Sequence, residues 1–259
     1  MPLIPAMLRR PERDPQGAMT LVEHLEELRR RLFISLGAIG LGAVLGWFLY
    51  EPLLRLMTDP YCEWVRTLAE NRRPPGGCRL IALGPIDPVM VKLKVVAILG
   101  LFVALPVVLY QLWAFIVPGL TKRERRMAVP FVLSSLVLFA FGGFVAYLTL
   151  PKALGFLLGF GGGTITPFLT ANSFLSFVLL VALAFGLTFE FPIVLIFLTI
   201  AGVLSTAKLR AWRRTAILVI AVAAAVITPS ADPYSMLAMM IPMVLFYEVA
   251  IIVGRLMKK

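Results

Sequence analysis

Long apolar stretches separated by short charged segments form the main pattern of this chain. Six stretches contain few charges and approach the length of about 20 residues that a helix needs to cross a hydrocarbon core. The pattern predicts an all-α integral membrane protein with six transmembrane helices. The predicted spans are residues 32–50, 89–117, 127–150, 174–201, 215–228 and 234–254.

The spans leave a polar tail and three outer loops. Residues 1–19 are rich in Pro and Arg and are predicted to be a disordered cytoplasmic tail, whereas residues 20–259 form one membrane domain. The span 215–228 would be only about 21 Å long, less than the hydrocarbon thickness, so it must borrow flanking residues or thin the bilayer. The predicted outer loops are 51–88, 151–173 and 229–233.

Basic residues gather on one side of the predicted helices. Because cytoplasmic loops carry the excess of Lys and Arg, both termini are predicted to be cytoplasmic. The first span is expected to be a retained anchor, since no small-residue cleavage site follows it before Glu51. The net charge of +11 is divided among four segments, so topology explains it better than nucleic-acid binding. The inner basic residues are Arg9, Arg10, Arg13, Arg29, Arg30, Arg31, Lys122, Arg123, Arg125, Arg126, Lys208, Arg210, Arg213, Arg214, Arg255, Lys258 and Lys259.

Composition supports the membrane class and excludes others. Hydrophobic residues make up 60% of the chain and charged residues 15%. The chain has one histidine, no zinc-spaced His/Cys cluster and no nucleophile elbow, and the glycines at 161–163 lack the Lys-Ser/Thr of a phosphate-binding loop. We therefore expect no enzymatic activity, no metal and no cofactor.

The two cysteines, Cys62 and Cys78, both lie in the first predicted outer loop. The Pro/Gly-rich stretch 73–77 between them can turn the chain back, which predicts a disulfide on the oxidising side of the membrane. Two unpaired thiols are the alternative, because spacing alone does not fix the distance between the Cα atoms.

A single acid interrupts the fourth apolar stretch. Glu190 is the only charged residue between Lys152 and Lys208. A carboxylate at the centre of a membrane helix costs about 2.5 to 3.5 kcal/mol on insertion scales, so we expect it to meet an ion, a substrate, a water-filled cavity or a partner helix. Pro192 is predicted to kink the helix and expose backbone carbonyls beside the acid.

Polar groups also gather at the cytoplasmic ends of the predicted spans. Residues 20–33 form an amphipathic helix with Glu27 and Arg31 on one face, and this feature alone fits an interfacial anchor as well as a recognition site. Glu124 is a lone carboxylate among four cations, which could serve only to neutralise them. Glu248 precedes Arg255 by about two helical turns and could pair locally.

Together these motifs resemble the TatC family, the receptor subunit of the twin-arginine protein translocase. The resemblance covers nearly the whole chain after about the first twenty residues, and the separated motifs occur in the family's order. The residues that carry it are His24, Glu27, Arg29, Arg31, Pro106, Tyr110, Gln111, Trp113, Phe115, Pro118, Glu124, Phe185, Glu190, Pro192, Thr228, Asp232, Pro242, Tyr247 and Glu248.

The resemblance implies a cup-shaped membrane protein that binds the twin-arginine signal peptides of folded cargo. Glu27 and Glu124 match the family positions that meet the two arginines, with Arg29 and Arg31 orienting these acids and Phe115 lining the contact surface. Carboxylates suit this task because guanidinium forks bind them through two parallel hydrogen bonds, which Lys reproduces poorly.

The resemblance also implies partners and a location. Glu190, Asp232 and Glu248 are expected to contact the single-span subunits TatA and TatB, and the chain is expected to form homo-oligomers in a bacterial cell membrane and to use the proton-motive force. The cysteine-containing outer loop fits an actinobacterial-type member. A proton-coupled small-solute transporter with Glu190 as relay is the alternative, but it predicts two related halves, and no internal repeat relates the spans.

Overall fold

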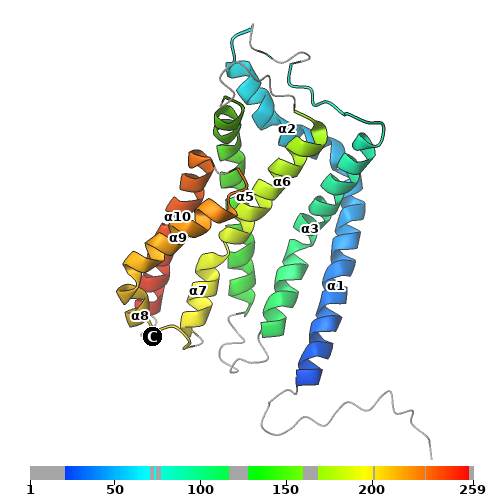
Figure 1. The fold of residues 1–259 in the computed structure, drawn as a ribbon. Helices are drawn as coiled ribbons and strands as arrows, with labels where there is room; N and C mark the ends of the chain where they lie inside the picture. The colour runs from blue at the N-terminus through cyan, green and yellow to red at the C-terminus, as the bar shows by residue number, and fades with distance from the viewer. Residues whose placement is uncertain are drawn as a thin grey trace, which may run out of the picture.

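The computed structural model describes residues 21–70, 73, 77–116, 128–159, 169–200, 202–230 and 232–256, and the regular secondary structure of this part of the chain is helical apart from one isolated bridge. The predicted tail 1–19 and the predicted site residue Glu124 lie outside the described residues. Figure 1 shows the long helices side by side, with α2 across one end. The first turn of α1 and the last turn of α10 lie at the opposite end (Figure 1). The described helices are α1 (Leu21–Phe48), α2 (Tyr50–Thr67), α3 (Asp87–Ile116), α5 (Ala128–Gly159), α6 (Ala171–Thr188), α7 (Phe191–Ile200), α8 (Thr206–Ala211), α9 (Arg213–Ile227) and α10 (Pro233–Leu256).

Five helical segments in the described part of the chain are long and apolar enough to cross a membrane. They correspond to the first, second, third, fourth and sixth predicted spans. The fifth predicted span, 215–228, falls on α9, which has only 15 residues, so the count of six spans stays a prediction. The five segments are Val22–Phe48, Asp87–Phe115, Val129–Gly159, Ala171–Ile200 and Pro233–Leu256.

The region predicted as the first outer loop, 51–88, contains the helix α2, which the sequence analysis did not predict. Its buried residues Met57, Pro60, Tyr61 and Val65 recur at helical spacing on one face and pack against the ends of α5 and α6. The helix escaped prediction because charged residues occupy its other face and Pro60 interrupts its apolar pattern. Helix α5 continues to Gly159 and so extends into the segment 151–173, which was predicted as an outer loop.

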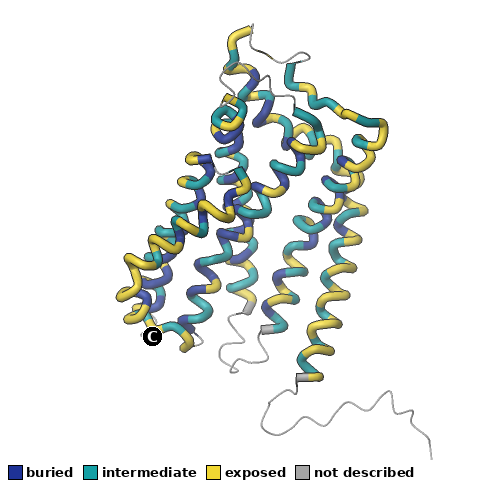
Figure 2. The backbone as a smooth tube through the Cα atoms, viewed as in Figure 1, coloured by how far each residue is buried: buried dark blue, intermediate teal, exposed yellow. Residues whose placement is uncertain are grey.

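Helices α1 and α3 are held together by direct backbone contact. A methyl group added at Gly100 would lie 2.6 Å from the carbonyl oxygen of Ile39 and 2.7 Å from the nitrogen of Ala43. A methyl group added at Gly42 would lie 2.5 Å from the carbonyl oxygen of Gly100. Such contacts let two helices approach closely in a membrane, where the hydrophobic effect does not drive helices together. Elsewhere α1 is largely exposed, as Figure 2 shows.

The two lysines of α3 contact neighbouring helices near the end of the helix bundle that carries α2. Lys94 Nζ donates hydrogen bonds to Asn172 Oδ1 at 2.6 Å and to Ser176 Oγ at 2.7 Å, both on α6. Lys92 Nζ lies 4.0 Å from the ring centroid of Trp47 on α1, a cation–π contact. These contacts explain how α3 tolerates two charges inside an apolar helix.

Two cross-links order the segments around α2. Cys62 and Cys78 are joined by a disulfide, with their Cα atoms 4.9 Å apart. Ile81 forms a parallel bridge with Thr170, the residue that caps α6. The Ile81 carbonyl accepts a hydrogen bond from the Ala171 N–H at 2.9 Å. The segment after α2 is therefore tied to the start of α6.

We predict that Gly100→Ala destabilises the protein by about 1 to 3 kcal/mol, because the added methyl group must displace backbone atoms of α1. Gly40→Ala is the matched control, since a methyl group there has no described atom within 4 Å and alanine favours the helix. Thermal unfolding in detergent measures both variants. Equal melting temperatures for the two would contradict the backbone contact.

Candidate functional site

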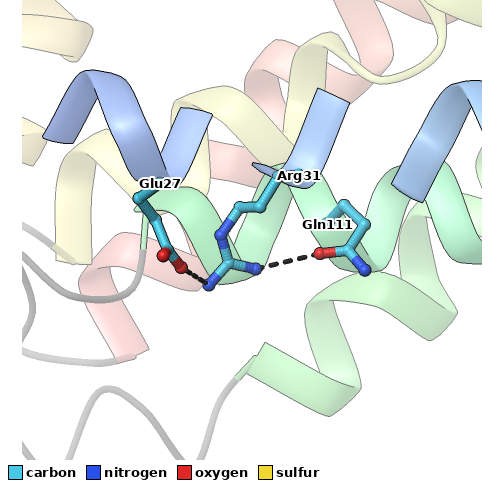
Figure 3. A network of polar contacts seen from close by, with 3 residues as sticks. All are labelled: Glu27, Arg31 and Gln111. Atoms are coloured by element: carbon cyan, nitrogen blue, oxygen red, sulfur yellow. Dashed lines mark hydrogen bonds and ion pairs between the residues drawn. The ribbon is translucent and has the colours of Figure 1, made fainter. Parts of the chain in front are cut away.

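A polar cluster joins α1 and α3 at the end of the molecule opposite α2 (Figure 3). Glu27 and Arg31 lie one helical turn apart on α1, and Arg31 Nη2 donates to Glu27 Oε1 at 2.5 Å. Arg31 Nη1 donates to Gln111 Oε1 of α3 at 3.0 Å. The side chains of Arg31 and Glu27 are 19% and 25% exposed, so the carboxylate remains within reach of a ligand.

An aromatic contact continues this cluster toward the end of α3. The rings of His24 and Phe115 are stacked, with centroids 4.2 Å apart. Gln111 and Phe115 are one turn apart on α3, and their partners on α1 follow in the reverse order, as expected for antiparallel helices. The cluster thus presents a carboxylate, a guanidinium and an apolar ring face together.

The structure brings together only part of the predicted set. Glu27, Arg31 and Phe115 belong to the cluster, whereas Arg29 is exposed on α1 and has no ion pair among the described residues. Glu124, the second predicted acid, lies outside the described residues. Gln111 was part of the sequence motif but was not predicted as a site residue, because an amide at a helix end gives no signal until its partner is known.

Glu190 lies at a break between α6 and α7, close to Pro192, where the sequence predicted a disturbance of the helix. Helix α6 ends at Thr188 and α7 begins at Phe191. Pro192 has no N–H with which to bond the carbonyl four residues earlier, so the α-helical ladder cannot continue through it. The Glu190 carbonyl accepts the first bonds of α7, from the N–H groups of Ile193 and Val194.

The Glu190 side chain is only partly satisfied. Ser135 of α5 lies beside the carboxylate. Nevertheless Glu190 Oε1 and Ser135 Oγ are both buried and form no hydrogen bond of good geometry with the described residues. Since an unsatisfied buried polar atom is costly, this pair retains bonding capacity for another group.

Asp232 acts within the chain as the N-cap of α10. Its Oδ1 accepts a hydrogen bond from the Ser235 N–H at 2.8 Å, and its Oδ2 accepts one from the Ser230 hydroxyl. The residue is fully buried and precedes Pro233 at the first helical position, a combination that favours helix initiation. This geometry gives Asp232 a structural role, and its predicted contact with a partner helix stays a prediction.

Glu248 also has a partner within the chain. Its Oε2 accepts a hydrogen bond from Arg213 Nη2 at 2.5 Å, which joins α10 to α9. The adjacent Tyr247 donates its buried hydroxyl to the Leu209 carbonyl at 2.7 Å, which joins α10 to α8. Both contacts hold the short helices against α10. A metal-binding group of three or more His, Cys, Asp or Glu residues is not found in the described ranges.

We predict that Asp232→Ala destabilises the protein by about 1 to 2 kcal/mol, because α10 loses its N-cap. Glu248→Ala is the comparison, and removal of this exposed ion pair should change stability by less than about 1 kcal/mol. Thermal unfolding of the two variants in the same detergent provides the measurement. An unchanged melting temperature for Asp232→Ala would contradict the capping role.

Comparisons with known proteins agree with the fold and the motifs. The family model described as Sec-independent protein translocase protein (TatC) matches residues 23–242. A curated relative from Frankia casuarinae with that name is 46% identical over 252 residues, which cover 95% of this chain and 68% of the relative. A second, from Koribacter versatilis, is 39% identical over 250 residues and covers 95% of this chain and 89% of the relative.

A solved structure shows the same architecture. The crystal structure of a protein described as the twin arginine translocase receptor TatC superposes with a TM-score of 0.71 at 36% sequence identity. The match covers 92% of this chain and 100% of that one. A family model that spans most of the chain, relatives above 30% identity and a matching fold all lead to one assignment: the chain belongs to the TatC family of Sec-independent protein translocase proteins.

Proposed function

We propose that this chain is the signal-peptide receptor and core subunit of a twin-arginine translocase. It would bind the paired arginines of a signal peptide at the cytoplasmic face and act with TatA and TatB to export folded proteins. The observation that supports this most directly is Glu27, a partly exposed carboxylate on α1 that already accepts a guanidinium N–H. Family membership favours this function over the proton-coupled transporter.

The proposed site has two acids, one for each arginine. Glu27 is held on α1 by its contact with Arg31 and by the packing of α1 on α3. Glu124 belongs to the segment that joins α3 to α5, and the described ends of both helices lie at the Glu27 end of the molecule (Figure 1). The stacked rings of His24 and Phe115 would supply an apolar surface for the side chains that follow the arginines.

The proposed topology has six spans with both termini in the cytoplasm. The end of the molecule that carries Glu27 would then face the cytoplasm, in agreement with the excess of Lys and Arg in the inner segments. In this topology α9 is the fifth span, and its 15 residues would reach only about 22 Å. A locally thin membrane beside α9 follows, which would ease the passage of a wide cargo.

Glu190 is proposed as a docking point for the transmembrane helices of partner subunits. Glu190 Oε1 and Ser135 Oγ are buried with unused bonding capacity, and the break between α6 and α7 adjoins the acid. A polar side chain on a partner helix would satisfy these groups inside the membrane. The chain itself supplies no chemistry in this account, and the proton-motive force would drive transport.

We predict that Glu27→Ala and Glu124→Ala each weaken binding of an Arg-Arg signal peptide by at least about tenfold, since each removes a charged hydrogen-bond acceptor. Glu26→Ala is the matched control, because Glu26 is exposed and precedes Glu27 directly in the sequence. Fluorescence titration of the detergent-purified chain with Arg-Arg and Lys-Lys peptides measures the affinities. If the wild-type chain binds both peptides equally, the receptor function is excluded.

We predict that Glu190→Ala leaves signal-peptide binding intact and reduces co-purification of TatA and TatB. Glu190→Gln should retain most of that co-purification, because an amide keeps one acceptor oxygen and still forms hydrogen bonds but cannot relay a proton. Quantitative pull-down of the three proteins from membranes compares the variants. Normal recovery of both partners with Glu190→Ala would contradict the docking role, and loss of export with both variants despite normal recovery would favour a proton relay.

A further inference from the structure

The guanidinium of Arg31 is divided between two acceptors on different helices. Its Nη2 bonds Glu27 Oε1 within α1, and its Nη1 bonds Gln111 Oε1 across the contact with α3. Its Nε is buried and has no hydrogen-bond partner among the described residues. Figure 3 shows the planar group lying between the carboxylate and the amide.

The way in which Arg31 bonds its two acceptors determines which oxygen of Glu27 remains available to a ligand. An arginine that pairs with a carboxylate commonly aligns two N–H groups with both oxygens. Arg31 bonds Glu27 Oε1 through Nη2 and the Gln111 amide oxygen through Nη1. Glu27 Oε2 therefore receives no hydrogen bond from Arg31. A ligand arginine therefore meets a carboxylate that already lies beside a cation but still has one acceptor to offer.

The position of Gln111 relative to Arg31 is fixed by the packing of α1 on α3. Below the polar cluster, Gly42 and Gly100 hold the two backbones in contact. At the helix ends, His24 stacks on Phe115, one turn beyond Gln111. With contacts on both sides, the amide oxygen stays within hydrogen-bond distance of Arg31 while the Glu27 side chain remains partly exposed.

We propose that Gln111 is a positioning residue of the receptor site, which holds one arm of the Arg31 guanidinium and so keeps Glu27 Oε2 available to the arginine of a signal peptide. This inference rests on the proposed receptor function. A neutral amide can fill this role because its oxygen accepts a hydrogen bond from the Arg31 guanidinium.

Removal of the amide acceptor should close the site. Gln111→Met keeps a side chain of similar length but has no hydrogen-bond acceptor as strong as the carbonyl oxygen of Gln111. The guanidinium of Arg31, released from α3, would then align two of its N–H groups with both oxygens of Glu27. Gln111→Glu should act in the opposite direction, because a carboxylate on α3 draws the guanidinium away from Glu27.

The test is a double-mutant cycle read by the affinity for Arg-Arg and Lys-Lys signal peptides, using the full chain in detergent. We expect Gln111→Met to weaken Arg-Arg binding about tenfold, because Arg31 would then hold both oxygens of Glu27. Gln111→Glu should bind the Arg-Arg peptide at least as tightly as the wild type. In an Arg31→Lys background, Gln111→Met should change the affinity for the Arg-Arg peptide by less than about twofold, because lysine has no guanidinium that could bond two acceptors through separate nitrogens.

Three results would overturn the inference. Wild-type affinity in Gln111→Met would show that the amide does not position Arg31. If Gln111→Met and Gln111→Glu lose the same affinity for the Arg-Arg peptide, Gln111 has a structural role or contacts the ligand directly. The same conclusion follows if Gln111→Met loses as much affinity in the Arg31→Lys background as in the wild type. A wild-type chain without preference for the Arg-Arg peptide would overturn the receptor function together with this inference, whereas the first two results leave that function standing.

Discussion

The close approach of α1 and α3 is the contact on which the candidate receptor site depends. Gly42 and Gly100 allow the two backbones to touch, and a side chain at either position would separate the helices. Because α1 is otherwise largely exposed, this contact fixes where its N-terminal turns lie. The hydrogen bond from Arg31 to Gln111 and the stacking of His24 on Phe115 exist only at this separation. Helix packing inside the membrane thus determines the geometry of polar groups at its surface.

Among the described residues, two buried atoms without a hydrogen bond, Glu190 Oε1 and Ser135 Oγ, lie where the proposed contact with partner helices occurs. Lys94, Asp232 and Glu248 all have partners within the chain, and they stabilise its fold. Glu190 and Ser135 keep buried atoms without hydrogen bonds among the described residues, at a break in the helix. A membrane protein that must bind partner helices needs such capacity, because lipid cannot supply hydrogen bonds.

The sequence predicted the family, five of the apolar spans and the break near Glu190, because each depends on local composition. Long apolar runs predict spans, and Pro192 predicts a break from its missing N–H. The helix α2 was missed because its amphipathic pattern resembles a charged loop when its packing surface on α5 and α6 is unknown. Gln111 was missed because its partner Arg31 is 80 residues away. Asp232 could have been identified as a cap, since an acid followed by Pro is a helix-start signal.

The central claim is that the paired arginines of a signal peptide bind where α1 meets α3. The most direct measurement places a photo-reactive side chain next to the two arginines and identifies the crosslinked residues of the full translocase by mass spectrometry. The account predicts crosslinks to the turns of α1 around Glu27 and to the end of α3 around Phe115. Crosslinks that fall instead around Glu190, with none on α1, would contradict it.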